Sequence, residues 1–251
     1  MTATVVSAYY MIKSKLPSSK YVEWISNFMK LDMKCVIFTN KYTFENVFKN
    51  AYPTTSRRIY KIVEISEFEV SSYDWEKDYD KDHEKHVGHS PELYKVWAEK
   101  SFFLKRIIEE NPFATEYFFW NDIGLFRFNN LVGLLKDYPN VSNIENKIYM
   151  TLVNLYSKSE FANLSVCDER FRYVNRIAGG NFGGHKDVLL KFIDEYKKTL
   201  EEFDILNLFK GKDQSLYSWM IVRNPDMFKL VSDPKYSNIL IKWFYLYIYL
   251  K

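Results

Sequence analysis

Short apolar runs and amphipathic segments alternate through the first 65 residues. Runs at residues 5–9, 35–39 and 58–65 predict three buried strands. Between the first two, residues 18–28 begin with a serine cap and place apolar side chains at helical spacing. Residues 43–50 predict a short helix or turn. Because parallel strands need crossover helices between them, this order predicts a parallel α/β sheet, the arrangement of one half of a nucleotide-binding fold.

The middle of the chain begins with an acidic segment. Residues 66–89 interleave acids with Lys and Tyr, and they predict a solvated excursion from the core. A capped helix is expected over residues 91–110, and it ends at Asn111-Pro112. The aromatic run at residues 117–120 predicts another buried strand.

The second half of the chain is expected to continue the same fold. Residues 147–153 predict a strand, residues 186–203 a long amphipathic helix, and residue 213 starts a shorter helix. Four of the eight glycines lie within residues 179–184. We see no internal repeat and no linker, so one continuous α/β domain over residues 1–251 is predicted.

Composition and charge exclude several classes of protein. Hydrophobic residues make up 47% and charged residues 27%, an ordinary globular balance. The 35 basic and 32 acidic side chains leave a net charge of +3, which argues against a nucleic-acid partner. No apolar run is long enough to predict a transmembrane segment. Two cysteines, Cys35 and Cys167, and no evident signal peptide predict a reducing, cytoplasmic location.

Asp122 is the first candidate for chemistry. It follows the aromatic strand, and Gly124 allows a sharp turn after it. Ligands of open α/β sheets bind beyond the carboxyl ends of the strands, so this carboxylate could hold Mg²⁺ or Mn²⁺. The alternative is a turn residue that accepts a hydrogen bond from its own backbone.

Basic groups flank this strand. Lys100 lies on the helix before it and Arg127 just after it, and either could reach a diphosphate. Ordinary surface charge is the alternative for both.

Two further candidates lie in the second half. The glycines at 179, 180, 183 and 184 could let the backbone approach a ligand, or could form a tight strand-to-helix connection. Asp213 and Gln214 could bind vicinal sugar hydroxyls, or could cap a helix.

Histidines at 83, 86 and 89 favour a solvated loop over a zinc site, because three-residue spacing without a helix does not bring three imidazoles to one metal. The aromatic tail over residues 239–250 predicts a packed terminal element, with peripheral membrane contact as the alternative.

With these residues identified, the chain resembles the HtrL/YibB family over most of its length. The resemblance is carried by residues 5–10, by residues 97–100 with residues 119–127, and by the glycine-rich residues 179–184. That family is similar to GT-A glycosyltransferases, which implies a GT-A-like domain with a mostly parallel sheet flanked by helices. A D-x-D motif holds the metal in such enzymes, and here Trp120-Asn121-Asp122 keeps only its last acid.

The resemblance implies a metal-assisted transfer from a nucleotide-sugar donor, expected to be a UDP-sugar, to a glycan or other hydroxyl acceptor. Residues 1–125 would form the nucleotide-binding half and residues 126–251 the acceptor half. Asp213 and Gln214 would be catalytic and Asp122 the ligand of Mn²⁺ or Mg²⁺. The donor would be bound by Ser7, Tyr9, Tyr10, Lys100, Arg127, Gly179, Gly180 and Gly183. The alternative is a GT-A-like protein that binds a nucleotide or glycan without transferring it.

Overall fold

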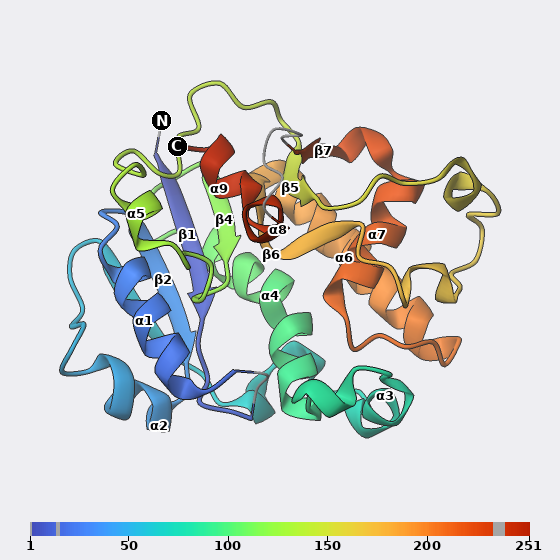
Figure 1. Ribbon diagram of the computed structural model, residues 1–251, viewed down its shortest axis with the longest axis horizontal. Coiled ribbons are helices and arrows are strands. Elements are labelled where there is room, and N and C mark those ends of the chain that lie inside the picture. The colour runs from blue at the N-terminus through green and yellow to red at the C-terminus, as the bar shows by residue number, and fades with distance from the viewer. Residues whose placement is uncertain (1, 14–15, 233–238) are drawn as a thin grey trace.

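The computed structural model describes residues 2–13, 16–232 and 239–251, and its centre is one seven-stranded sheet (Figure 1). The strand order is β3-β2-β1-β4-β6-β5-β7. The strands are β1 (Ala3–Ala8), β2 (Lys34–Thr39), β3 (Arg58–Ile62), β4 (Tyr117–Asn121), β5 (Ile148–Leu152), β6 (Ile177–His185) and β7 (Phe228–Val231). The first four strands pair in parallel, and so do β5 and β7. The predicted mostly parallel α/β sheet is confirmed.

Helices cover both faces of the sheet. The longer ones are α1 (Ser18–Met29), α3 (Trp75–Lys81), α4 (Pro91–Glu110), α6 (Lys186–Ile205) and α7 (Asp213–Arg223). The short ones are α2 (Lys41–Thr43), α5 (Asn129–Val132), α8 (Ile239–Trp243) and α9 (Tyr245–Tyr249). Ser90 caps α4 by accepting the N–H of Leu93, and Pro91 occupies its first turn, as the sequence predicted.

Successive side chains of each strand point to opposite faces of the sheet, and each face carries its own hydrophobic core. Val6 and Trp120 face the core beneath α4, α6 and α7. Val5 and Phe119 face the core beneath α1 and the C-terminal segment. This period of two explains why the strands read as continuous apolar runs: both faces of the sheet are buried.

The glycine-rich segment is a strand rather than a connection, which corrects one expectation. Residues 179–184 lie inside β6, which runs antiparallel between β4 and β5. A Cβ at Gly183 would collide with Phe118 and Phe119 of β4, and one at Gly184 would collide with the Lys147 carbonyl. The glycines therefore allow β6 to pack closely against its neighbours.

The acidic segment at residues 66–89 is not a solvated excursion. Trp75 and Asp78 are buried, and Asp78 accepts hydrogen bonds from both the backbone and the side chain of Lys210. Asp82 is buried too. Burial of these acids is tolerated because each has partners, a long-range feature that local composition does not reveal.

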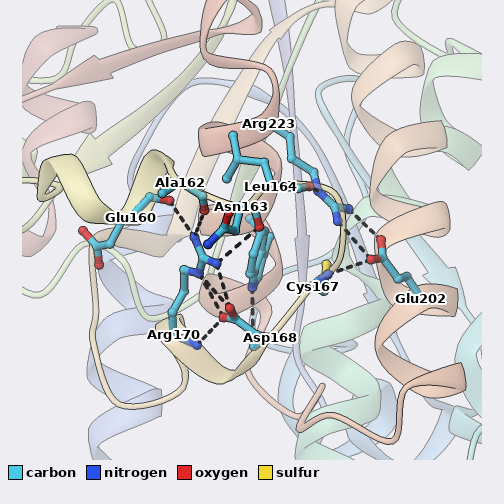
Figure 2. Close-up of polar contacts among 10 residues, drawn as sticks. Glu160, Ala162, Asn163, Leu164, Cys167, Asp168, Arg170, Glu202 and Arg223 are labelled. Carbon is cyan, nitrogen blue, oxygen red and sulfur yellow. Dashed lines mark hydrogen bonds and ion pairs between the residues drawn. The ribbon is translucent and has the colours of Figure 1, made fainter.

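Two arginines hold the long segment between β5 and β6 against α6 and α7 (Figure 2). Arg170 binds Asp168 through Nε and Nη2 and donates to the carbonyls of residues 160 and 162. Arg223 of α7 forms two hydrogen bonds with Glu202 of α6. The indole of Trp219 contacts both guanidinium groups. This clamp fixes the orientation of α7, whose first residue is Asp213.

The C-terminal tail packs on the sheet. Leu246, Tyr247 and Leu250 are buried in the same core as α1, and the Leu246 N–H donates to Thr151 of β5. Among the described residues, no helix combines the length and the apolar character needed to span a membrane. The packed terminal element expected from the sequence is thus observed.

Candidate functional site

The site lies where β4 ends and the antiparallel strand β6 begins (Figure 1). Asp122 directly follows β4, and its N–H donates to the Gly180 carbonyl at 2.8 Å. Because β6 runs in the opposite direction, the start of that strand lies beside the carboxyl end of β4. Asp122 and the first glycines of β6 therefore meet, although they are far apart in the sequence.

A buried lysine links the two acids singled out in the sequence. The Nζ atom of Lys100, on α4, lies 3.1 Å from Oδ1 of Asp122 and 2.8 Å from Oδ2 of Asp213. It also donates to the Gly179 carbonyl at 3.1 Å. Its side chain is only 3% exposed. Burial lowers the pKa of Lys100, but the two carboxylates raise it more, so the ammonium stays charged.

Trp120 occupies the place of the first acid of the D-x-D pattern. Its indole Nε1 donates to Oδ1 of Asp122 at 2.7 Å. Oδ1 thus receives hydrogen bonds from both Trp120 and Lys100, while no described residue donates to Oδ2. The Asp122 side chain is 42% exposed. One oriented carboxylate oxygen therefore faces the cleft.

Asp213 is oriented as firmly as Asp122. It begins α7 and is 7% exposed, and its Oδ1 accepts the N–H of Gln214 at 2.8 Å. The Gln214 side chain donates to the carbonyl of Ile177 at the start of β6. Asp213 is thus an acid in the first turn of its helix, as the sequence suggested, and a partner of Lys100 as well.

Two adjoining cavities share this centre. The first, of about 310 Å³, is mainly aromatic and is lined by Tyr9, Tyr10, Tyr21, Trp24, Trp97 and Trp120. The second, of about 370 Å³, is called the polar cavity because Glu84, His89, Lys212, Asp213 and Gln214 line it, although the rings of Trp97 and Phe244 line it too. Lys100, Asp122, Arg127 and Gly180 line both.

Arg127 is held by stacking rather than by an acid. Its guanidinium lies 4.4 Å from the Trp24 ring and 4.8 Å from the Phe244 ring, and Nε donates to the Gly124 carbonyl. Neither Nη atom has a hydrogen-bond partner among the described residues. Arg127 is therefore oriented over the faces of two rings, with donors left for a ligand.

Two of the sequence-predicted residues are not brought to the cavities. Ser7 is fully buried within β1, and Gly183 lies against Phe118 and Phe119. Neither lines the first or the second cavity. Ser7 faces the side of β1 opposite to Ala8, which lines the first cavity. Gly183 lies farther along β6 than Gly179 and Gly180, at the contact with β4.

Several lining residues were missed in the sequence. His89, Glu84 and Lys212 come from segments that looked solvated, and Phe244 comes from the apolar tail. Trp97 lines both cavities but reads in the sequence as an apolar residue of α4. The one local signal available was that His89 directly precedes Ser90, the predicted cap of the helix over residues 91–110.

The residues present were examined for the divalent cation that the D-x-D resemblance implies. Among the residues that the structure describes, no three His, Cys, Asp or Glu side chains are grouped to hold a metal. Asp122 Oδ2, however, is oriented and without a donor among them. Mg²⁺ is commonly held by one or two carboxylates, with water and substrate phosphates as the other ligands. The site fits a cation bound in that way.

The charges that line the cavities lead to the same conclusion. Three cationic side chains, Lys100, Arg127 and Lys212, are matched by three carboxylates. The carboxylates belong to Glu84, Asp122 and Asp213. A nucleoside diphosphate entering this balanced site would bring negative charge that the side chains alone do not neutralise. A divalent cation would supply that neutralisation.

Comparison with known proteins identifies the family. The chain belongs to the HtrL/YibB family, described as bacterial proteins of unknown function, whose sequence model matches residues 4–250. No curated protein matches the sequence.

Two solved structures are similar in the arrangement of their elements. One is the crystal structure of mouse xyloside xylosyltransferase 1 in its apo form, at 8% identity, with 97% of this chain and 94% of that chain covered and a TM-score of 0.47. The other is the galactosyltransferase LgtC in complex with donor and acceptor sugar analogs. The two sequences are 10% identical, the match covers 91% of this chain and 73% of that chain, and the TM-score is 0.48.

Proposed function

We propose that the protein is a glycosyltransferase that moves a sugar from a nucleotide-sugar, a UDP-sugar in our interpretation, to a hydroxyl group of a glycan. One observation carries this proposal: Lys100 holds Asp122 and Asp213 at the junction of an aromatic and a polar cavity. A nucleotide-sugar has the same division, because a flat base is joined through a diphosphate to a polar sugar ring.

The aromatic cavity suits the nucleoside. Tyr9 and Tyr10 follow β1 at its carboxyl end, where ligands of α/β sheets bind, and their rings can pack on a base. Arg127 lines both cavities and has unpaired Nη donors among the described residues, so it is the cation placed to bind the diphosphate. The ammonium of Lys100 donates to Asp122, Asp213 and the Gly179 carbonyl, so we assign it as a positioning residue.

The polar cavity suits the sugars. Asp213 and Gln214 line it together with Gly179, whose lack of a side chain leaves room for the Asp213 carboxylate. Carboxylate and amide groups fixed in this way can accept and donate hydrogen bonds to hydroxyls of the donor sugar. The proposed acceptor half, residues 126–251, contributes these groups, although its Arg127 and Phe244 also line the nucleoside cavity.

Transfer requires the nucleoside diphosphate to leave as the acceptor oxygen bonds to the anomeric carbon. A divalent cation bound at Asp122 would supply charge stabilisation to the departing diphosphate. Arg127 would bind the same group, and Lys100 would hold both acids in place beside the rings of Trp97 and Phe244, which line both cavities.

The test is a screen of UDP-sugars with the purified protein, measuring release of UDP with and without Mn²⁺ and with glycan acceptors. We expect acceptor-dependent release that Arg127→Met slows strongly. Arg57→Met, an exposed arginine paired with Asp32, is the matched control and should leave release unchanged. Absence of turnover across the donor panel would count against the transferase proposal.

A second candidate is a binding protein that holds a nucleotide or glycan without transferring it. The observation in its favour is that three of the four carboxylate oxygens at the centre already accept hydrogen bonds. Calorimetry separates the two functions. Tight UDP-sugar binding that is lost in Arg127→Met, without turnover, would select the binding protein.

A further inference from the structure

A histidine and an aspartate form a buried pair at the edge of the polar cavity. Nδ1 of His89 lies 2.6 Å from Oδ2 of Asp82, and the side chains are 8% and 0% exposed. Asp82 ends α3, and His89 immediately precedes Ser90, the cap of α4. The pair thus joins the end of one helix to the start of the next.

The surroundings of Asp82 fix the proton on the imidazole. Oδ2 of Asp82 also accepts the Tyr94 hydroxyl at 2.7 Å, and Oδ1 accepts the Glu84 N–H at 2.8 Å. Burial raises the pKa of Asp82, but these hydrogen bonds and that of His89 outweigh it and lower the pKa below its usual value. The carboxylate therefore stays ionised and only accepts, so Nδ1 of His89 must donate. In the neutral imidazole, Nε2 then carries the lone pair.

That lone pair faces the cavity. His89 lines the polar cavity with Asp213, Gln214 and Lys212. Nε2 has no hydrogen-bond partner among the described residues. It is not among the buried, unpartnered side-chain atoms of those residues, so part of its surface is accessible. The Trp97 ring meets the imidazole edge-on at 5.1 Å and restricts its rotation. Nε2 is therefore an oriented acceptor next to the proposed sugar site.

The acids of the cavity are occupied in other ways. Asp213 accepts from Lys100 and Gln214, and Glu84 forms an ion pair with Lys212. Asp122 keeps one oxygen, which the proposed function assigns to a cation. A base for the acceptor hydroxyl is therefore still needed, and His89 is the lining group whose chemistry matches.

We infer that His89 is the catalytic base that takes the proton of the acceptor hydroxyl, and that Asp82 is its positioning residue. This inference rests on the proposed function. The acceptor O–H bond breaks as its proton passes to Nε2, and the oxygen bonds to the anomeric carbon. The bond from that carbon to the diphosphate oxygen breaks, and its electron pair leaves with the nucleoside diphosphate. The imidazolium then returns its proton to water.

The first experiment compares His89→Gln with His86→Gln, a change of an exposed histidine in the same segment. We expect His89→Gln to reduce kcat by about 10² to 10⁴ at nearly constant KM for the donor, the usual contribution of a positioned base. His86→Gln should leave kcat unchanged. Equal turnover in the two variants would overturn the assignment.

Rescue by imidazole separates a base from a structural support. His89→Ala leaves a space at the cavity wall, and added imidazole should restore part of its turnover. Asp82→Asn should lower kcat with little change in KM. A His89→Ala protein that keeps its melting temperature but does not respond to imidazole would contradict the base role.

A spectroscopic test is independent of turnover. In protein with ¹⁵N-labelled histidine, the signals lost in His89→Gln identify His89 and should show a protonated Nδ1 and an unprotonated Nε2. A protonated Nε2 would overturn this inference even if transfer is observed. Absence of transfer by the unchanged protein would instead count against the proposed function.

Discussion

Gly179 and Asp213 lie so close that a side chain at position 179 would collide with the acid. An added Cβ would lie 2.9 Å from each of the two Asp213 carboxylate oxygens. Because Asp213 is held by Lys100 and by the Gln214 N–H, it has little freedom to move aside.

Gly179→Ala should therefore displace the Asp213 carboxylate. It should weaken nucleotide-sugar binding strongly and lower the stability of the protein only a little. The measurement is the Kd for a UDP-sugar together with the melting temperature. Gly133→Ala is the control, because a Cβ there meets nothing within 4 Å. Identical affinities for the two variants would show that position 179 does not shape the ligand site.

Asp122→Ala should abolish the metal-dependent part of nucleotide binding, because Asp122 Oδ2 is the proposed protein ligand of the cation. Calorimetric titration of UDP with Mn²⁺ and with EDTA measures that part. Asp226→Ala, a change of an exposed acid, should bind as the unchanged protein does. Unaltered affinity for UDP with Mn²⁺ in Asp122→Ala would remove Asp122 from the metal assignment.

The pair of Lys100 and Asp213 should show strong coupling in a double-mutant cycle. Breaking a buried ion pair leaves an uncompensated charge, so Lys100→Met and Asp213→Asn should each lower the free energy of unfolding by about 3–5 kcal/mol. The double variant should lose less than the sum of the two.

Urea unfolding measures this cycle. The surface pair of Lys186 and Glu116 is the control, and its coupling should be much weaker, because solvent screens exposed charges. Additive effects at Lys100 and Asp213 would show that the ion pair does not hold the site together.

Stability at low pH should depend on Glu202. Its hydrogen bonds with Arg223 lower its pKa from 4.5 to about 2. A depressed folded-state pKa means that the stabilisation is present above pH 4.5 and is lost as the pH falls from 4.5 to about 2. The melting temperature of Glu202→Gln should therefore fall less between pH 6 and pH 3 than that of the unchanged protein. The exposed Glu109→Gln should follow the unchanged protein; a Glu202→Gln curve parallel to both would contradict the assignment.

Local pattern was enough for most of the sheet and for part of the site. The apolar runs around Val6, Val36 and Phe119 predicted β1, β2 and β4, because strands buried on both faces show no polar alternation. Asp122 was found for a related reason, since it follows such a strand and ligands bind at that edge.

The rest depended on contacts between distant segments. Asp82 lies only seven residues before His89, but local sequence does not show that the two side chains meet beside the polar cavity, because the packing of α3 against α4 brings them together. Gly183 looked like a loop residue because its function is to fit against Phe118 of another strand. Phe244 belongs to a tail whose apolar character predicted burial but not its contact with Arg127.

The hydrogen bond between Lys100 and Asp213 joins positions 113 residues apart. A contact of that separation requires the closure of a long loop, which slows folding and delays the contact. During synthesis, Lys100 leaves the ribosome well before its acid exists, so the cleft can form only after α7 has emerged. A ligand of the cleft therefore stabilises only chains in which synthesis has passed α7 and the cleft has formed. Its concentration in the cell would then influence how many newly made chains reach the native state.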